Sequence, residues 1–289
     1  AEEIAALRTR DGKPYRLFPL PWARPILDEG RRLAASYANF LIVNGAVLMP
    51  AYGDPADAKA LSAALSAAQA VLITTPPDAH GCPALRALTP LAGDAWPDWI
   101  GYVSSTSVYG DRAGGWVFED GPLNAANLEG ARRVRAERDW LDGAQGMGLT
   151  VQIFRLPGFY GPARSVVERL REGTAKLVRK PGQVFNRIHV DDIVSGLFAS
   201  MAQPRPGAAY NLTDDEPSPA DVVMEWAADR MGLPRPPQVD WTDDSVSEAM
   251  RRFYLDSKRV SNALAKAELM AGHEEEGLKL METAISADH

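Results

Sequence analysis

Four consecutive hydroxyl residues follow a β-rich run near the middle of the chain. Residues 102–110 read Tyr-Val-Ser-Ser-Thr-Ser-Val-Tyr-Gly, so that Ser105 and Thr106 stand just beyond an expected strand at 99–104. Ligands gather at the carboxyl ends of strands in open parallel sheets, where such hydroxyls could hold a substrate oxygen. A serine-rich strand end is equally typical of hydrogen-bonded loop structure.

Glu129 and Arg133 are separated by one helical turn, in a segment rich in both charges. A glutamate could act as an acid or base toward a substrate hydroxyl, a role that a tyrosine also fills. The carboxyl group of a glutamate ordinarily has a pKa of about 4.3, whereas the phenol of a tyrosine has a pKa of about 10. A glutamate would therefore need strong desolvation to exchange protons with an alkoxide. The alternative is a surface ion pair on a solvated helix, which stabilises by about 0.3–0.5 kcal/mol. His189, close to Asp191 and Asp192, is a further acid/base candidate or a structural residue.

A phosphate-binding turn needs glycines and free backbone amides. After an expected strand at 15–20, the turn 19–25 reads Pro-Leu-Pro-Trp-Ala-Arg-Pro and has no glycine, although Arg24 could grip a phosphate. The alternative first strand is 40–43, followed by Asn44-Gly45, which also marks an ordinary tight turn. Thr74, Thr75 and Pro76 follow an expected strand at 70–74, where they either contact a ligand or terminate the strand.

Short β-rich runs alternate with helical stretches, as in βαβ units of a parallel sheet. The expected strands lie at 15–20, 40–43, 46–49, 70–74, 99–104 and 151–155, and the expected helices at 57–68, 128–142, 219–231 and 244–254. The sequence predicts a Rossmann-like, doubly wound parallel α/β sheet over residues 1–156. Prolines cluster later in the chain, which favours a smaller C-terminal α/β substrate lobe over residues 157–289, interleaved with the sheet.

Composition excludes several classes of protein. A net charge of −7 argues against a nucleic-acid partner, because phosphate backbones require concentrated Lys and Arg. No apolar run approaches the ~20 residues of a membrane helix, and the Ala-Glu-Glu start resembles no signal peptide. The single Cys82 permits no intrachain disulfide, which fits a reducing compartment. We expect a cytoplasmic protein without a metal site, and the oligomeric state stays open, a homodimer included.

Five segments in order resemble the extended short-chain dehydrogenase/reductases, the NAD-dependent epimerase/dehydratase family. The first is 45–73, which resembles the third strand, acidic turn, helix and fourth strand of that family. The others are 102–110, 154–162 (Phe-Arg-Leu-Pro-Gly-Phe-Tyr-Gly-Pro), 187–193 (Arg-Ile-His-Val-Asp-Asp-Ile) and 210–212. The resemblance covers residues 45 to about 215 and is greatest to atypical members of the family.

The resemblance implies binding of NAD or NADP and a small-molecule substrate, with epimerase, dehydratase or oxidoreductase chemistry. It places Ser105, or else Thr106, at the substrate oxygen, and Asp54 at the adenine ring. Asp54 followed by Pro55 is also an ordinary helix start. The family pattern Tyr-Gly-x-Ser-Lys-x-x-x-Glu aligns with residues 129–137, so that Glu129 replaces the tyrosine and Arg133 replaces the lysine. The sequence therefore leaves two hypotheses: an atypical enzyme, or a catalytically silent protein that senses a ligand or binds a partner.

Overall fold

A computed structural model provides the fold of the chain. It describes the backbone of four short strands before residue 50, and residues 68–92, 96–162 and 165–269. The chain divides into two compact units, residues 1–75 with 82–98 and residues 76–81 with 99–289. The boundary expected at residue 156 is a different division and stays a prediction.

The first unit has short strands and a helix in its described part. Its elements are β1 (Ile26–Asp28), β2 (Arg31–Leu33), β3 (Leu41–Val43), β4 (Ala46–Leu48), β5 (Ala70–Ile73) and α3 (Pro83–Ala92). β1 and β2 pair antiparallel, as do β3 and β4, whereas β4 and β5 pair parallel. The expected strand at 15–20 and the expected helix at 57–68, apart from its last residue, lie outside the described residues.

The pairing of β4 bears on two expectations about the first unit, and corrects one of them. Val43 pairs with Ala46, so the strands on either side of residues 44–45 are antiparallel, which favours the tight-turn interpretation over the phosphate-turn alternative. In the order 3-2-1-4 of this fold, the strand beside the fourth is the first. β4 pairs directly with β5, the expected fourth strand, so the assignment of this segment to the third strand is wrong. The physical reason is that strand order depends on pairing, which a local pattern does not encode.

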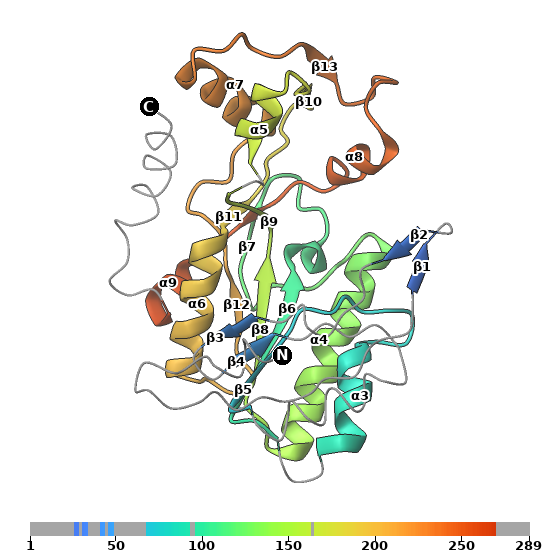
Figure 1. Cartoon of the computed structure of the whole chain (residues 1–289), viewed down its shortest axis with the longest axis vertical. Coiled ribbons are helices and arrows are strands. Elements are labelled where there is room, and N and C mark those ends of the chain that lie inside the picture. The colour runs from blue at the N-terminus through green and yellow to red at the C-terminus, as the bar shows by residue number, and fades with distance from the viewer. Residues whose placement is uncertain are drawn as a thin grey trace, which may run out of the picture. The chain divides into compact units, whose positions relative to one another are not determined.

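The second unit contains the longest strands and helices of the described chain (Figure 1). Its strands are β6 (Trp99–Ser105), β7 (Trp116–Val117), β8 (Val151–Leu156), β9 (Gly158–Tyr160), β10 (Leu177–Arg179), β11 (Arg187–His189), β12 (Ala209–Asn211), β13 (Gln238–Asp240) and β14 (Arg259–Val260). Its helices are the 3-10 helix η1 (Thr106–Tyr109), α4 (Leu128–Met147), α5 (Val166–Arg171), α6 (Val190–Ala202), α7 (Ala220–Arg230), α8 (Glu248–Phe253) and α9 (Ala263–Glu268).

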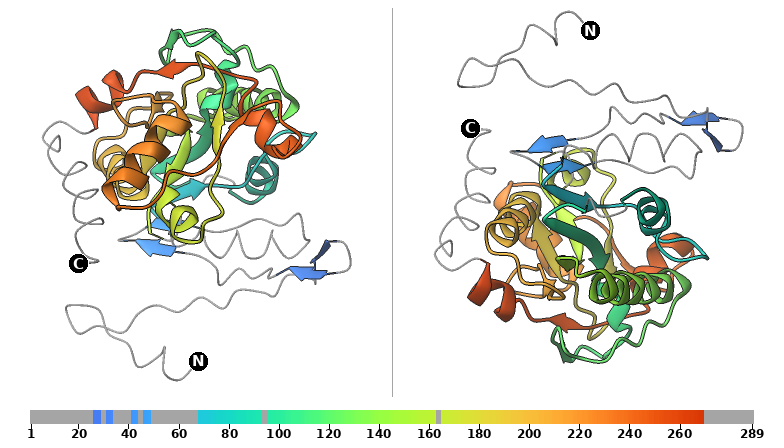
Figure 2. Two further views of the ribbon diagram at one scale, coloured as in Figure 1. Left: turned by 90° about the horizontal axis from the view of Figure 1, so that it is seen from above. Right: turned by 90° about the horizontal axis from the view of Figure 1, so that it is seen from below.

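Helices cover both faces of the central strands. β6 and β12 pair parallel with β8 on either side, and every residue of β8 is buried. Because side chains alternate along a strand, Gln152 and Arg155 point to opposite faces. Gln152 bonds Ser200 of α6, and Arg155 bonds Glu137 of α4, so the two helices pack on opposite faces of the sheet (Figures 1 and 2). This two-sided burial explains the continuous apolar runs in the sequence.

A smaller cluster of elements follows the central strands. α5, α7 and β10 share an apolar core, and β10 pairs parallel with β13. This core is formed by Leu170, Ala175, Leu177, Met224, Ala227 and Ala228. The helices expected at 128–142, 219–231 and 244–254 are confirmed as α4, α7 and α8 with shifted ends. The prediction of an α/β fold with a parallel sheet is confirmed.

Candidate functional site

Ser105 ends β6, and its hydroxyl stabilises the turn that follows. Ser105 adopts an extended backbone and caps η1, because its Oγ accepts a hydrogen bond from the Ser107 N–H at 3.1 Å. Thr106 is buried. Both residues lie at the carboxyl end of a parallel strand, where this fold binds its ligands. Ser105 therefore has the role in hydrogen-bonded loop structure that was the alternative to a ligand contact. Its side chain stays partly exposed.

The first turn of α4 packs against η1. Asn127 caps the helix, because its Oδ1 accepts from the Gly130 N–H at 2.7 Å. A Cβ atom added to Gly130 would lie 2.8 Å from the Ser107 carbonyl oxygen, so only glycine permits this approach. The contact holds the beginning of α4 beside the end of β6, the strand that carries Ser105.

Arg133 and Ser105 are brought to the same edge of the sheet. The Arg133 Nη1 donates to the Val103 carbonyl oxygen of β6 at 3.1 Å, two residues before Ser105. Glu129 lies one turn earlier on α4 and is exposed. Among the described residues no ion pair joins Glu129 to Arg133, so the surface pair expected from their spacing is wrong. The guanidinium instead bonds the strand backbone, a contact that no local sequence pattern encodes.

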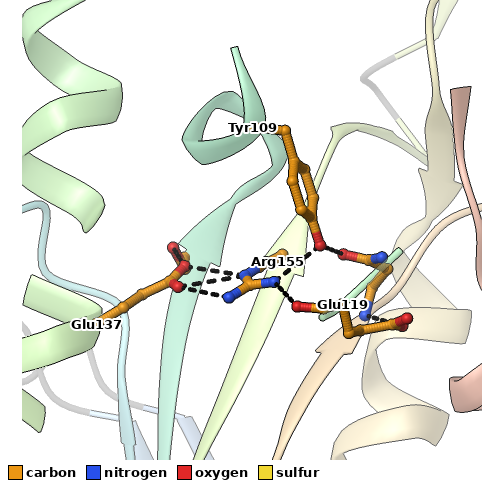
Figure 3. Close-up of polar contacts among 6 residues, drawn as sticks. Tyr109, Glu119, Glu137 and Arg155 are labelled. Atoms are coloured by element: carbon orange, nitrogen blue, oxygen red, sulfur yellow. Dashed lines mark hydrogen bonds and ion pairs between the residues drawn. The ribbon is translucent and has the colours of Figure 1, made fainter. Parts of the chain in front are cut away.

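A buried polar network lies beneath this edge, and the sequence did not predict it (Figure 3). Glu137 of α4 accepts a hydrogen bond from Ser104 and forms an ion pair with Arg155 of β8, with 2.9 Å between Oε2 and Nη2. Arg155 also donates to the Tyr109 hydroxyl and to the Glu119 carbonyl, each at 2.8 Å.

The network continues into β12. The Tyr109 hydroxyl donates to Asn211 Oδ1 at 2.7 Å, and the Asn211 N–H donates to the Glu119 carboxylate at 3.0 Å. Tyr109 is fully buried, so aromatic packing and hydrogen bonding explain it better than a place on a ligand site. Glu137 closes the aligned pattern 129–137, which is the signal that could have identified it.

Burial and ion pairing act in opposite directions on this network. Burial alone would lower the pKa of Arg155, but the Glu137 carboxylate outweighs burial and raises it. Burial raises the pKa of Tyr109, and the Arg155 guanidinium only partly offsets that rise. Both groups therefore keep their protons at neutral pH. The network fixes α4, β8 and β12 together.

A second titratable cluster joins β9, β11 and the segment after β12. The Tyr160 hydroxyl and the His189 backbone N–H bond the Asp214 carboxylate, and the His189 ring lies edge-on to Tyr160 at 5.2 Å. Burial, with Asp192 nearby, raises the pKa of Asp214 to about 6. Asp214 was missed by sequence reasoning, although it follows a strand end.

His189 has a structural role in this cluster. Its Nδ1 accepts from the Asp191 N–H at 3.2 Å, so it caps α6. This contact supports the interpretation of His189 as a structural residue at the start of a helix.

The candidate nucleotide residues are placed only in part. Arg24 and Asp54 lie outside the described residues. After β5, Thr74 is exposed, Thr75 is buried and Pro76 is exposed. In the described ranges, no three His, Cys, Asp or Glu side chains group as a metal site requires, and no helix is long and apolar enough to cross a membrane.

Solved structures resemble most of the chain. A functionally unknown conserved protein from Silicibacter pomeroyi is 42% identical, with 78% of this chain and 79% of that chain covered and a TM-score of 0.68. A dTDP-glucose 4,6-dehydratase from Streptomyces venezuelae with NAD bound is 20% identical over 74% of this chain and 70% of its own, with a TM-score of 0.58. A UDP-glucuronic acid 4-epimerase from Bacillus cereus in complex with NAD is 15% identical, with 73% and 69% covered and a TM-score of 0.57.

The N-terminal part of the chain resembles a different class of protein. The family model of the Porphyromonas-type peptidyl-arginine deiminases matches residues 1–75. Agmatine deiminases from Stutzerimonas stutzeri and Pseudomonas putida are 61% identical over 33 residues, which are 11% of this chain and only 9% of each relative. The expected first strand, Arg24 and Asp54 all fall within the matched range.

The fold is one that binds nicotinamide dinucleotides, but the residues of this chain fit such a cofactor only in part. Ser105 and Arg133 lie together at a strand end, as a ligand site of this fold requires. The residues after β4 lack the glycines that a diphosphate needs. The chain belongs to the family of the conserved Silicibacter pomeroyi protein and has the fold of the extended short-chain dehydrogenases, the NAD-dependent epimerase/dehydratase proteins.

Proposed function

We propose that this chain binds a small molecule and the nicotinamide end of NAD or NADP at the carboxyl end of β6, as an atypical oxidoreductase or epimerase. Ser105, with Thr106 beside it, holds the substrate oxygen. Glu129 and Arg133 take the positions of the tyrosine and the lysine in the family pattern that residues 129–137 resemble, and we assign them the acid/base role and its support. The observation that carries the proposal is the convergence of Ser105 and the first turns of α4 at one strand end.

The chemistry of these residues limits what the site does. A serine hydroxyl donates and accepts hydrogen bonds, so it can orient a carbonyl or hydroxyl oxygen. Glu129 is exposed, and its carboxylate can accept hydrogen bonds from a bound molecule. The planar guanidinium of Arg133 has the geometry to pair with a phosphate or carboxylate.

A second candidate function is a ligand-binding protein without turnover. It is favoured by the hydrogen bond from Arg133 to the Val103 carbonyl, which occupies the guanidinium with the protein backbone. The replacement of a phenol by the Glu129 carboxylate favours it as well. In this case the same strand end binds a small molecule and no proton transfer follows.

Fluorescence titration separates the proposal from a protein without this site. The chain has 7 Trp, so NADH and NADPH are titrated to millimolar concentration while tryptophan emission is followed. Saturable quenching by either supports the proposal, and its absence with both contradicts it.

A double variant tests whether the strand end retains a latent catalytic site. Glu129→Tyr with Arg133→Lys should gain NADH oxidation with small aldehydes and ketones if the rest of the catalytic arrangement is intact. The matched control is Asp139→Tyr with Arg135→Lys, because Arg135 and Asp139 form an exposed i,i+4 ion pair on the same helix. Gain in both pairs or in neither speaks against a latent catalytic site at 129 and 133.

A further inference from the structure

β4 occupies the position from which this fold normally binds the diphosphate of a dinucleotide. It pairs parallel with β5, with Ala46 opposite Ala70 and Leu48 opposite Leu72. In the strand order 3-2-1-4, the strand beside the fourth is the first, and the glycine-rich turn follows that strand. The turn brings backbone N–H groups and a helix N-terminus to the diphosphate.

The sequence after β4 has the opposite chemistry. Residues 49–55 read Met-Pro-Ala-Tyr-Gly-Asp-Pro, with one glycine where the fingerprint G-x-G-x-x-G has three. Two prolines remove backbone donors, and Asp54 adds a negative charge that repels a diphosphate. The deiminase-type match covers this whole segment, which explains why the fingerprint is missing.

Helix starts in the second unit do not replace the missing turn. Five of its described helices carry carboxylates in their first turns, where an anion would otherwise bind; α9 has none there, but it is only 6 residues long and its cap Asn262 bonds the Asp215 carboxylate. These carboxylates are Glu129 in α4, Glu168 in α5, Asp191 and Asp192 in α6, Asp221 in α7 and Glu248 in α8. In the first unit, α3 has no acidic residue in its first turn but begins at Pro83, which has no N–H.

We infer that neither the described residues nor the sequence 49–55 offers a cradle for the diphosphate of NAD or NADP, because the sequence that follows the strand beside β5 is of the deiminase type. The inference rests on the proposed function and narrows it. The site at Ser105 recognises the nicotinamide riboside part of a cofactor, or a small molecule alone, and the adenylate half adds little affinity. Deiminase activity is no part of the proposal, since the aligned segment is 9% of those relatives.

The test compares two reduced nicotinamides on the full chain. NADH contains the diphosphate and the adenylate, whereas reduced nicotinamide mononucleotide lacks both the second phosphate and the adenosine. Two lost charge-assisted hydrogen bonds correspond to about a hundredfold in affinity or more. The expected result is dissociation constants that agree within about threefold, since no such bonds are made.

Each outcome bears on the inference. NADH that binds about a hundredfold tighter than the mononucleotide would overturn it and leave the proposed function standing. If the mononucleotide binds and NADH binds no more tightly than it does, both the inference and the proposed function stand. If neither binds at millimolar concentration, the missing cradle is supported and the proposed nicotinamide site fails.

An arginine variant tests Arg24, the cation that the sequence suggested for the diphosphate in place of a glycine-rich turn. Arg24→Ala should leave both dissociation constants unchanged, and Arg10→Ala, from the same matched segment, is the control. A loss of about tenfold in NADH affinity with Arg24→Ala alone would assign the diphosphate to Arg24 and overturn the inference.

Discussion

Two parts of one helix, α4, differ in how their charged residues are used. Its first turns present Glu129, exposed, and Arg133, which bonds the backbone of β6. Its middle carries Glu137, buried against Arg155 with side-chain exposures of 2% and 5%. The middle matches the family pattern and the first turns do not. The comparison indicates that the middle of α4 holds the scaffold together through a buried ion pair, whereas its first turns present charges to solvent and to the backbone of β6.

The largest expected effect comes from breaking the buried ion pair. Glu137→Ala leaves the Arg155 guanidinium buried without its carboxylate partner, and such losses cost about 3–5 kcal/mol. Urea unfolding followed by circular dichroism measures the change. Glu129→Ala, on the exposed first turn of the same helix, is the control. Similar losses in the two variants would contradict the comparison.

Asp214 is a partly buried carboxyl group outside the network of Glu137 and Arg155. Burial raises its pKa to about 6. A folded-state pKa above the unfolded value means that folding favours the protonated acid. Its stabilisation is complete below about pH 3.9 and is lost as the pH rises through about 6. The size is at most about 3 kcal/mol.

Asp214→Asn isolates this pH dependence. The free energy of unfolding of the variant should rise relative to the unmodified chain between about pH 4 and pH 7, since the amide does not titrate there. Urea midpoints at several pH values give the difference between the two proteins. A constant difference across that range would show that Asp214 titrates normally.

A smaller loss is expected from Tyr109→Phe. The variant removes the hydroxyl that donates to Asn211 and accepts from Arg155, and an unsatisfied buried group costs about 1–3 kcal/mol. Thermal and urea unfolding measure it. In a double-mutant cycle with Glu137→Ala the two losses should not add, because both residues contact Arg155. Additive losses would mean that they act independently.

The smallest effect is expected at the exposed end of α4. Glu129→Ala should change the free energy of unfolding by no more than about 0.5 kcal/mol, as surface substitutions usually do. Ligand binding at Ser105 can change in the same variant if Glu129 contacts the ligand. A loss of stability above about 1 kcal/mol would show that this carboxylate is part of the scaffold.

The sequence by itself determined the local elements of the second unit. Apolar runs at 99–104 and 151–155 predicted buried parallel strands, and the charged stretch from Leu128 predicted a helix. These predictions succeeded because burial on both faces of a strand and capping of a helix leave local patterns. The resemblance of the hydroxyl segment and the pattern 129–137 also identified the edge at which Ser105 and Arg133 meet.

Only the tertiary structure decided which strands and side chains are neighbours. The ion pair between Glu137 and Arg155 depends on the placement of α4 over β8, and the raised pKa of Asp214 depends on burial beside Tyr160. The pairing of β4 with β5 revised the assignment of the first unit in the same way. Strand order and burial arise from contacts between residues far apart in sequence, which no local spacing records.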